Sequence, residues 1–183
     1  MPEPIILPEI VTERLLLRRF RATDAAAVAA MCSTDAVQRG TLSLPYPYDE
    51  ACALSWIEGH DEAFAHGRYE YAVTDKATGA LYGCMGIFCN FTHGVGELGY
   101  WFGPAHWGKG YATEAAQAMI RAAFTAWGLN KVYGRHFTDN PASGRVMEKS
   151  GMQYEGTLRQ HLRKGEGYKD IVCRGILKSE WSK

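Results

Sequence analysis

A glycine-rich segment carries the clearest chemical signal in the sequence. Gly108 and Gly110 stand between a run typical of a strand, Val95 to Phe102, and an alanine-rich run with helical periodicity, Ala112 to Trp127. The first N–H groups of a helix have no internal partner and carry the positive end of the helix dipole. Because glycine lets a ligand approach that backbone closely, the segment predicts an anion site suited to phosphate.

A nucleotide-hydrolysing loop fits the same residues poorly. Gly103 to Lys109 supplies the first seven positions of the pattern Gly-x4-Gly-Lys-Ser/Thr, but Gly110 stands where a hydroxyl must hold magnesium. Trp107 also places a bulky side chain inside that loop. Nucleotide binding is therefore a distant alternative to the predicted anion site. A second alternative is that Gly108 and Gly110 only form a tight turn and bind no ligand.

The other elements must bring this segment to a sheet. The expected strands are 12–20, 69–75, 80–90, 95–102, 131–138, 152–163 and 168–177, and the expected helices are 24–31, 49–65, 112–127 and one opened by Asn140-Pro141. This order predicts an α/β fold with a mixed sheet of about seven strands. The middle strands form an antiparallel meander, a parallel crossover follows it, and helices cover both faces.

Composition narrows the classes of protein. A chain of 183 residues has the length of one domain, 1–183. Its 20 basic and 20 acidic residues argue against general binding to nucleic acid or to an anionic membrane. No apolar run is long enough to span a bilayer, and no secretory signal is expected. The five cysteines are scattered, which indicates reduced thiols, no metal site and a cytoplasmic location.

The segment Trp107 to Ala115 resembles the pyrophosphate loop of the GNAT acetyltransferases, in the form found in RimJ/RimL-type protein N-terminal acetyltransferases. The superfamily pattern Arg/Gln-x-x-Gly-x-Gly/Ala aligns with Trp107 to Ala112, and a tryptophan replaces the basic or amide residue. Other segments resemble the same branch: 12–18, 44–48, 97–102 and 140–152. The resemblance implies a GNAT-like fold with a splayed sheet, and acetyl transfer from acetyl-CoA to an amine.

The resemblance also assigns residues to the binding of acetyl-CoA. The backbone of Trp107, Gly108, Lys109, Gly110, Ala112 and Thr113 would hold the pyrophosphate. Tyr100, Trp101 and Phe102 would lie along the pantetheine arm, and the Asn140 amide would meet it. Glu114 is expected to point away from the phosphates, and Arg145 and Lys149 are expected on a solvated helix face.

Two residues are candidates for moving protons. Glu97 is the expected general base, because it lies among apolar residues on the strand that would carry the acetyl group, and Glu70 is the alternative. Ser143 is the expected acid for the leaving thiolate, because Met147 stands where the wider superfamily has a tyrosine. A hydrogen bond between Ser143 and the helix terminus is the structural alternative.

The acceptor amine is not determined by these residues. The branch favours a protein N-terminal α-amine, as in ribosomal-protein-alanine acetyltransferases. Polyamines, antibiotics and amino acids are alternatives among small-molecule amines. An acyl-CoA-binding sensor without turnover belongs to a different class and would not need Glu97. The sequence leaves a homodimer open.

Overall fold

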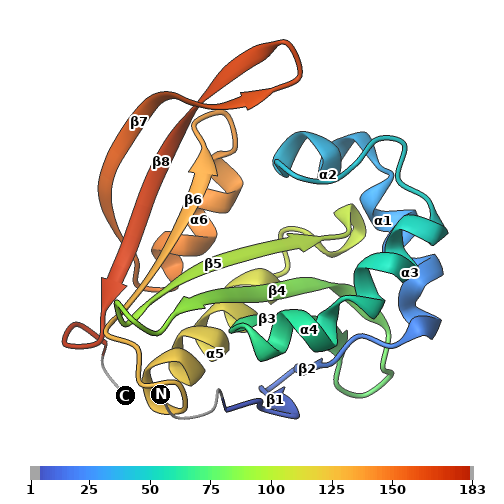
Figure 1. The fold of residues 1–183 in the computed structure, drawn as a ribbon, viewed down its shortest axis with the longest axis horizontal. Helices are drawn as coiled ribbons and strands as arrows, with labels where there is room; N and C mark the ends of the chain where they lie inside the picture. The colour runs from blue at the N-terminus through green and yellow to red at the C-terminus, as the bar shows by residue number, and fades with distance from the viewer. Residues whose placement is uncertain (1–4, 182–183) are drawn as a thin grey trace.

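The computed structural model describes residues 5–181 and contains one mixed sheet (Figure 1). Its eight strands run in the order β1-β2-β3-β4-β5-β6-β8-β7. The strands are β1 (Glu9–Val11), β2 (Leu15–Arg18), β3 (Arg68–Asp75), β4 (Leu81–Asn90), β5 (Val95–Phe102), β6 (Lys131–Phe137), β7 (Gln153–Lys164) and β8 (Gly167–Leu177). The six α-helices are α1 (Ala25–Cys32), α2 (Asp35–Gly40), α3 (Glu50–Glu58), α4 (His60–Ala65), α5 (Tyr111–Thr125) and α6 (Pro141–Lys149).

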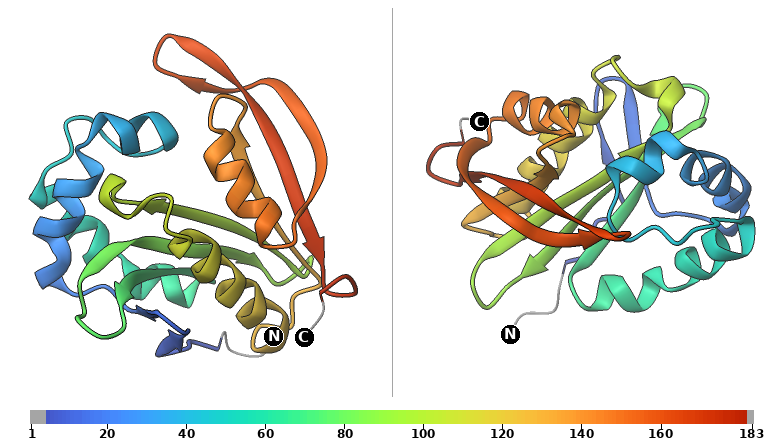
Figure 2. Two further views of the ribbon diagram at one scale, coloured as in Figure 1. Left: turned by 180° about the vertical axis from the view of Figure 1, so that it is seen from behind. Right: turned by 90° about the horizontal axis from the view of Figure 1, so that it is seen from above.

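Helices cover both faces of the sheet, as Figure 2 shows from behind and from above. The buried stripe of α5, which includes Met119, Ile120 and Phe124, packs on Tyr71 and Ile87 of the sheet. These side chains belong to the larger core. The helix α5 has one apolar face because every third or fourth of its residues is apolar. The opposite face carries a smaller core under α1 and α3. The expected α/β class, central meander and parallel crossover are confirmed.

The sheet opens between β5 and β6. These parallel strands pair only from Val95 with Lys131 to Leu98 with Gly134. Beyond Leu98 the two strands diverge, which Figure 1 shows, and β6 continues its pairing with β8. The backbone edge of β5 that faces β6 is therefore unpaired from Gly99 to Phe102, at the end of the strand that leads into the glycine-rich segment.

Several expected boundaries were wrong. The predicted helix 49–65 is two helices, α3 and α4, because the chain bends at Gly59. Asp49 does cap α3, since its side chain accepts from the N–H of Cys52 at 2.8 Å. Asp24 does not cap α1, because its carboxylate binds Arg18 instead.

Two short elements were missed. Strand β1 pairs with β2 and makes eight strands instead of about seven, and α2 lies after the expected helix 24–31, where no element was expected. Both are too short to show a hydrophobic period. Thr34 begins α2 by accepting from the N–H of Val37 at 3.4 Å. Within residues 5–181, no helix combines the length and the apolar character needed to cross a bilayer.

Candidate active site

A cavity of about 580 Å³ lies where β5 and β6 diverge. It is bounded by the end of β5, the following loop, the first turns of α5 and α6, α2, and the hairpin of β7 and β8. The structure brings all the predicted site residues to this cavity except Glu97 and Lys109. Those that line it are Tyr100, Trp101, Phe102, Trp107, Gly108, Gly110, Ala112, Thr113, Asn140 and Ser143.

The loop before α5 presents free backbone donors to the cavity. Gly108 and Gly110 have φ of 74° and 81°, which is the left-handed region that favours glycine. Within residues 5–181, the backbone N–H groups of Gly108, Lys109 and Gly110 donate no hydrogen bond. Together with the first N–H groups of α5, they give this end of the cavity a positive potential suited to phosphate.

Trp107 closes the loop on itself. Its indole N–H donates to the carbonyl oxygen of Phe102 at 2.7 Å, so the side chain joins the two ends of the turn. The ring also lines the cavity. The tryptophan at the first position of the superfamily pattern therefore makes a hydrogen bond within the loop.

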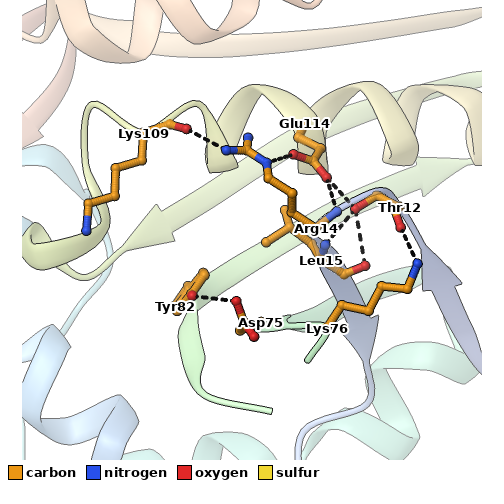
Figure 3. A network of polar contacts seen from close by, with 8 residues as sticks. All are labelled: Thr12, Arg14, Leu15, Asp75, Lys76, Tyr82, Lys109 and Glu114. Carbon is orange, nitrogen blue, oxygen red and sulfur yellow. Dashed lines mark hydrogen bonds and ion pairs between the residues drawn. The ribbon is translucent and has the colours of Figure 1, made fainter. Parts of the chain in front are cut away.

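The back of the same loop is held by Arg14, which the sequence did not single out (Figure 3). Its guanidinium donates to the carbonyl oxygen of Lys109 at 3.1 Å and to the Glu114 carboxylate at 2.7 Å. Thr12 also donates to Glu114, at 2.6 Å. Glu114 therefore points away from the cavity, as expected, and the Lys109 side chain extends into solvent.

Ser143 forms a hydroxyl pair with Tyr100. The Tyr100 hydroxyl lies 2.8 Å from Ser143 Oγ and donates to the Ser143 carbonyl oxygen at 3.0 Å. Burial raises the pKa of Tyr100 to about 12, so this group stays protonated at neutral pH. Asn140 caps α6 as expected, because its side chain accepts from the N–H of Ser143 at 3.2 Å. Sequence reasoning placed Tyr100 along the pantetheine arm but missed the contact of its hydroxyl with Ser143.

Met147 has no access to this pair. It is 1% exposed, and a Cβ added at Gly134 would lie 2.9 Å from its methyl carbon. The position that carries a tyrosine in the wider superfamily is therefore part of the core here. Tyr100 brings a phenol to Ser143 from β5 instead of from α6.

Glu97 lies outside the cavity lining, in an ion pair. Its carboxylate accepts from Arg135 Nε at 2.7 Å and from the Tyr133 hydroxyl at 3.1 Å. The side chain is 24% exposed. Since side chains alternate along a strand, Glu97 projects from the face opposite to Tyr100, where the two strands still pair.

Five cationic side chains line the cavity. Arg145 and Lys149 are exposed on α6, as expected, and also border the cavity near α5. Arg39, Lys164 and Lys169 lie on α2 and the hairpin. Asp139 is the single carboxylate among the lining residues, and Lys169 pairs with it. The free donors of the loop, the unpaired edge of β5 and this charge suit the pyrophosphate and pantetheine that the resemblance implies.

Known proteins are similar to this chain in sequence. Residues 14–153 match the acetyltransferase (GNAT) domain family. The chain is 33% identical over 159 residues to the uncharacterized N-acetyltransferase YoaA of Bacillus subtilis (strain 168), which covers 86% of this chain and 89% of that protein. A shorter match, 32% identical over 75 residues, covers 41% of this chain and 42% of the ribosomal-protein-serine acetyltransferase of Escherichia coli (strain K12).

A solved structure extends the likeness to the fold. The crystal structure of a GNAT-family acetyltransferase from Bacillus anthracis superposes with a TM-score of 0.82 at 28% identity, and the match covers 93% of this chain and 99% of that one. The match to the domain family spans the glycine-rich loop, β5 and all of α6, which are among the elements that build the cavity. The chain therefore belongs to the GNAT family of N-acetyltransferases, which are acyltransferases that use acetyl-CoA.

Proposed function

We propose that this chain acetylates a protein N-terminal α-amine with acetyl-CoA bound in the cavity between β5 and β6. The observation that carries the proposal is the continuity of the unpaired β5 edge with the free N–H groups before α5. Acetyl-CoA bound there has its pyrophosphate at Gly108 to Thr113 and its pantetheine along Tyr100 to Phe102. This pose brings the thioester to the Tyr100 and Ser143 hydroxyls.

The chemistry at that point is one acyl transfer. The amine nitrogen attacks the thioester carbonyl, a C–N bond forms and the C–S bond breaks. The departing thiolate takes a proton from the Tyr100 and Ser143 pair, in which either hydroxyl can be the donor. The proton that the amine loses as the amide forms passes to solvent, and solvent returns a proton to the pair. Burial of Tyr100 favours its protonated form, which keeps that proton available at neutral pH.

The charge of the cavity supports the choice of acceptor. A polyamine needs carboxylates, yet the lining offers five cations and one carboxylate that is already paired. A protein N-terminus brings a single amine on a mostly neutral backbone. The partial match to a ribosomal-protein-serine acetyltransferase supports the same class of acceptor.

The loop is tested by calorimetry with acetyl-CoA. Gly110→Asp should weaken binding at least about tenfold, because an L-residue is strained at a φ of 81° and its side chain would meet Arg14, which holds the loop in place. Gly128→Asp is the matched control, since Gly128 also has positive φ, at the far end of α5, with open space around it. Equal affinity in both folded variants would contradict the proposed site.

The acceptor is tested by measuring the free CoA thiol released with a panel of amines. The panel contains peptides that begin with serine or alanine, the same peptides with a blocked N-terminus, spermidine and free amino acids. Only the peptides with a free N-terminus should release CoA quickly. Release with spermidine or with an amino acid, and none with the peptides, would contradict the proposed acceptor.

A further inference from the structure

Three of the five cations that line the cavity belong to α2 and to the β7–β8 hairpin. Arg39 lies near the end of α2, Lys164 at the tip of the hairpin, and Lys169 on β8. Figure 1 shows α2 and this tip side by side above the opening between β5 and β6, and Lys164 joins them by donating to the carbonyl oxygen of Gln38 at 2.7 Å. These three side chains are called the cation cluster below.

The cation cluster carries more positive charge than its surroundings offset. Asp139 is the single carboxylate among the lining residues, and it pairs with Lys169. The ion pairs within residues 5–181 include none of Arg39 or Lys164. Burial and the neighbouring Lys169 lower the pKa of Lys164, and Asp139 only partly opposes this effect. Two of the three cations are therefore left without a carboxylate partner.

The cation cluster adjoins the start of α6, where the proposed chemistry takes place. Asp139, which pairs with the cluster, directly precedes Asn140, and a Cβ added at Gly40 of α2 would lie 3.3 Å from Asn140 Nδ2. Asn140 caps α6 through the N–H of Ser143, about one helical turn, or roughly 5 Å, further along. An extended peptide advances about 3.4 Å per residue, so a group one or two residues beyond the acceptor amine can reach the cluster.

The phosphates of acetyl-CoA do not account for this charge. In the proposed pose they lie at the loop before α5, and Arg145 and Lys149 border the cavity near that helix, since Gln117 of α5 donates to the carbonyl oxygen of Lys149 at 3.1 Å. The thioester end of acetyl-CoA is uncharged. An incoming ammonium group is repelled by unpaired cations, so the cluster is a disadvantage for an amine acceptor unless the acceptor also brings an anion.

We propose that the cation cluster binds a carboxylate of the acceptor, so that the enzyme prefers protein N-termini with aspartate or glutamate at the second or third residue. This inference rests on the proposed N-terminal acetylation. The Arg39 guanidinium offers two parallel N–H donors to such a carboxylate, and the two lysine ammonium groups add single charged donors. The bound carboxylate offsets the charge of the cluster and holds the N-terminal residue beside the thioester.

The test compares three peptides that begin with serine and differ only at the second and third residues, which are both glutamate, both glutamine or both lysine. Their kcat/KM is measured from the free CoA thiol released at saturating acetyl-CoA. The glutamate peptide should exceed the glutamine peptide at least about fivefold, mainly through a lower KM, and the lysine peptide should be the slowest. Raising the salt concentration to about 0.5 M should reduce this preference, because salt screens exposed charges.

Variants assign the preference to the cation cluster. Arg39→Gln and Lys169→Gln should each reduce the ratio of glutamate to glutamine peptide about two- to threefold, and the double variant should bring it close to one. Asp139→Asn should raise the ratio, because it removes the carboxylate that competes for the cluster. Lys178→Gln, which replaces an exposed lysine outside the cavity lining, is the matched control and should keep the wild-type ratio. Both peptides are measured on one preparation, so a loss of folded enzyme leaves the ratio unchanged.

Two results with these variants would overturn the proposal. If the cluster serves only to keep the acceptor amine deprotonated, Arg39→Gln should slow the glutamate and glutamine peptides by the same factor, because a nearby cation lowers the pKa of any amine. A preference for glutamate that is unchanged in the double variant would place its binding partner elsewhere on the protein.

The peptides also distinguish this inference from the function on which it rests. Failure of the wild type to acetylate any peptide with a free N-terminus would overturn both. A wild-type enzyme that acetylates the glutamine peptide as fast as the glutamate peptide would overturn the binding of a carboxylate and leave N-terminal acetylation standing.

Discussion

At the scale of single residues, the site places two hydroxyl groups where a lone serine was expected. A serine hydroxyl alone is a weak acid, and a hydrogen bond to the start of α6 would explain Ser143 without any role in chemistry. Its backbone N–H already bonds to Asn140, however, so its hydroxyl is free for Tyr100. A short hydroxyl chain can pass a proton to a thiolate, and burial keeps the phenol protonated until it is needed.

Removing either hydroxyl should slow the reaction and leave the fold intact. Ser143→Ala and Tyr100→Phe should each lower kcat about 10- to 100-fold, with a smaller change in the affinity for acetyl-CoA, because only the proton transfer is lost. Steady-state rates and melting temperatures measure both effects. Ser33→Ala, at the exposed end of α1, is the control. A less stable Ser143→Ala enzyme with unchanged kcat would show that the hydroxyl is structural.

The loss of kcat in a variant that lacks both hydroxyls tests whether they act together. If the two hydroxyls act as one relay, Ser143→Ala combined with Tyr100→Phe should be about as slow as the slower single variant. Independent roles would make the two losses multiply.

At the scale of elements, the anion site depends on how α5 begins. Its first turn is tied to the turn between β1 and β2 by Glu114, which accepts from Thr12 Oγ1, from the N–H of Arg14 and from the Arg14 guanidinium. The same guanidinium also holds the carbonyl oxygen of Lys109. The loop that presents the free N–H groups is thereby held from behind by Arg14 (Figure 3).

Glu114→Gln should therefore destabilise the protein in a pH-dependent way. Burial pushes the pKa of Glu114 up, but the hydrogen bonds from Thr12 and Arg14 outweigh it, so the pKa lies below its ordinary value of 4.5. A group with a lowered folded pKa stabilises the protein above its unfolded pKa and loses that effect as the pH falls through the folded one. At pH 7 the variant should lose about 1–2 kcal/mol of unfolding free energy.

Denaturant titrations at several pH values measure this difference. It should be full at pH 7 and shrink once the pH falls below about 4.5, as the wild-type carboxylate is protonated. Glu148→Gln, an exposed carboxylate on α6, should show no such loss. A difference that stays constant with pH would mean that the charge of Glu114 is irrelevant to the contact.

At the scale of the whole molecule, one lysine joins the β7–β8 hairpin to α2, and both elements border the cavity. Lys164, at the tip of the β7–β8 hairpin, donates to the carbonyl oxygen of Gln38 at 2.7 Å and also to that of Thr41. Its ammonium group lies 5.3 Å from the centroid of the Phe137 ring. The contact places a cation at the C-terminal end of α2, where the helix dipole favours it. It joins two segments of the cavity wall that lie more than a hundred residues apart in the sequence.

Lys164→Met should loosen α2 without loosening the sheet. Amide hydrogen exchange in α2 should become several-fold faster, because the helix loses its anchor to the hairpin, while α5 should keep its protection. Lys178→Met, which removes a surface lysine beyond β8, is the matched control. Unchanged exchange in α2 would show that other contacts hold this helix in place.

Much of the fold was predictable because it rests on local rules. The period of α5, the glycines on either side of it and the Asn140 cap depend on residues close together in the chain, and each was found as expected. The order of the elements predicted the meander and the parallel crossover, since few topologies connect them. The short elements β1 and α2 were not predictable, because three and six residues are too few to show a period.

The sequence by itself determined the glycine-rich loop, the helix behind it and ten of the residues that line the cavity. Tertiary structure alone decided which side chains meet there. Strand register placed Glu97 against Arg135 and Gly86 beside Glu70, and the position of α6 brought Ser143 to Tyr100. These contacts join residues from different elements, and a shift of one residue in register would turn each side chain to the other face of the sheet. The physical reason is that such pairings depend on how whole strands align and where β5 leaves β6.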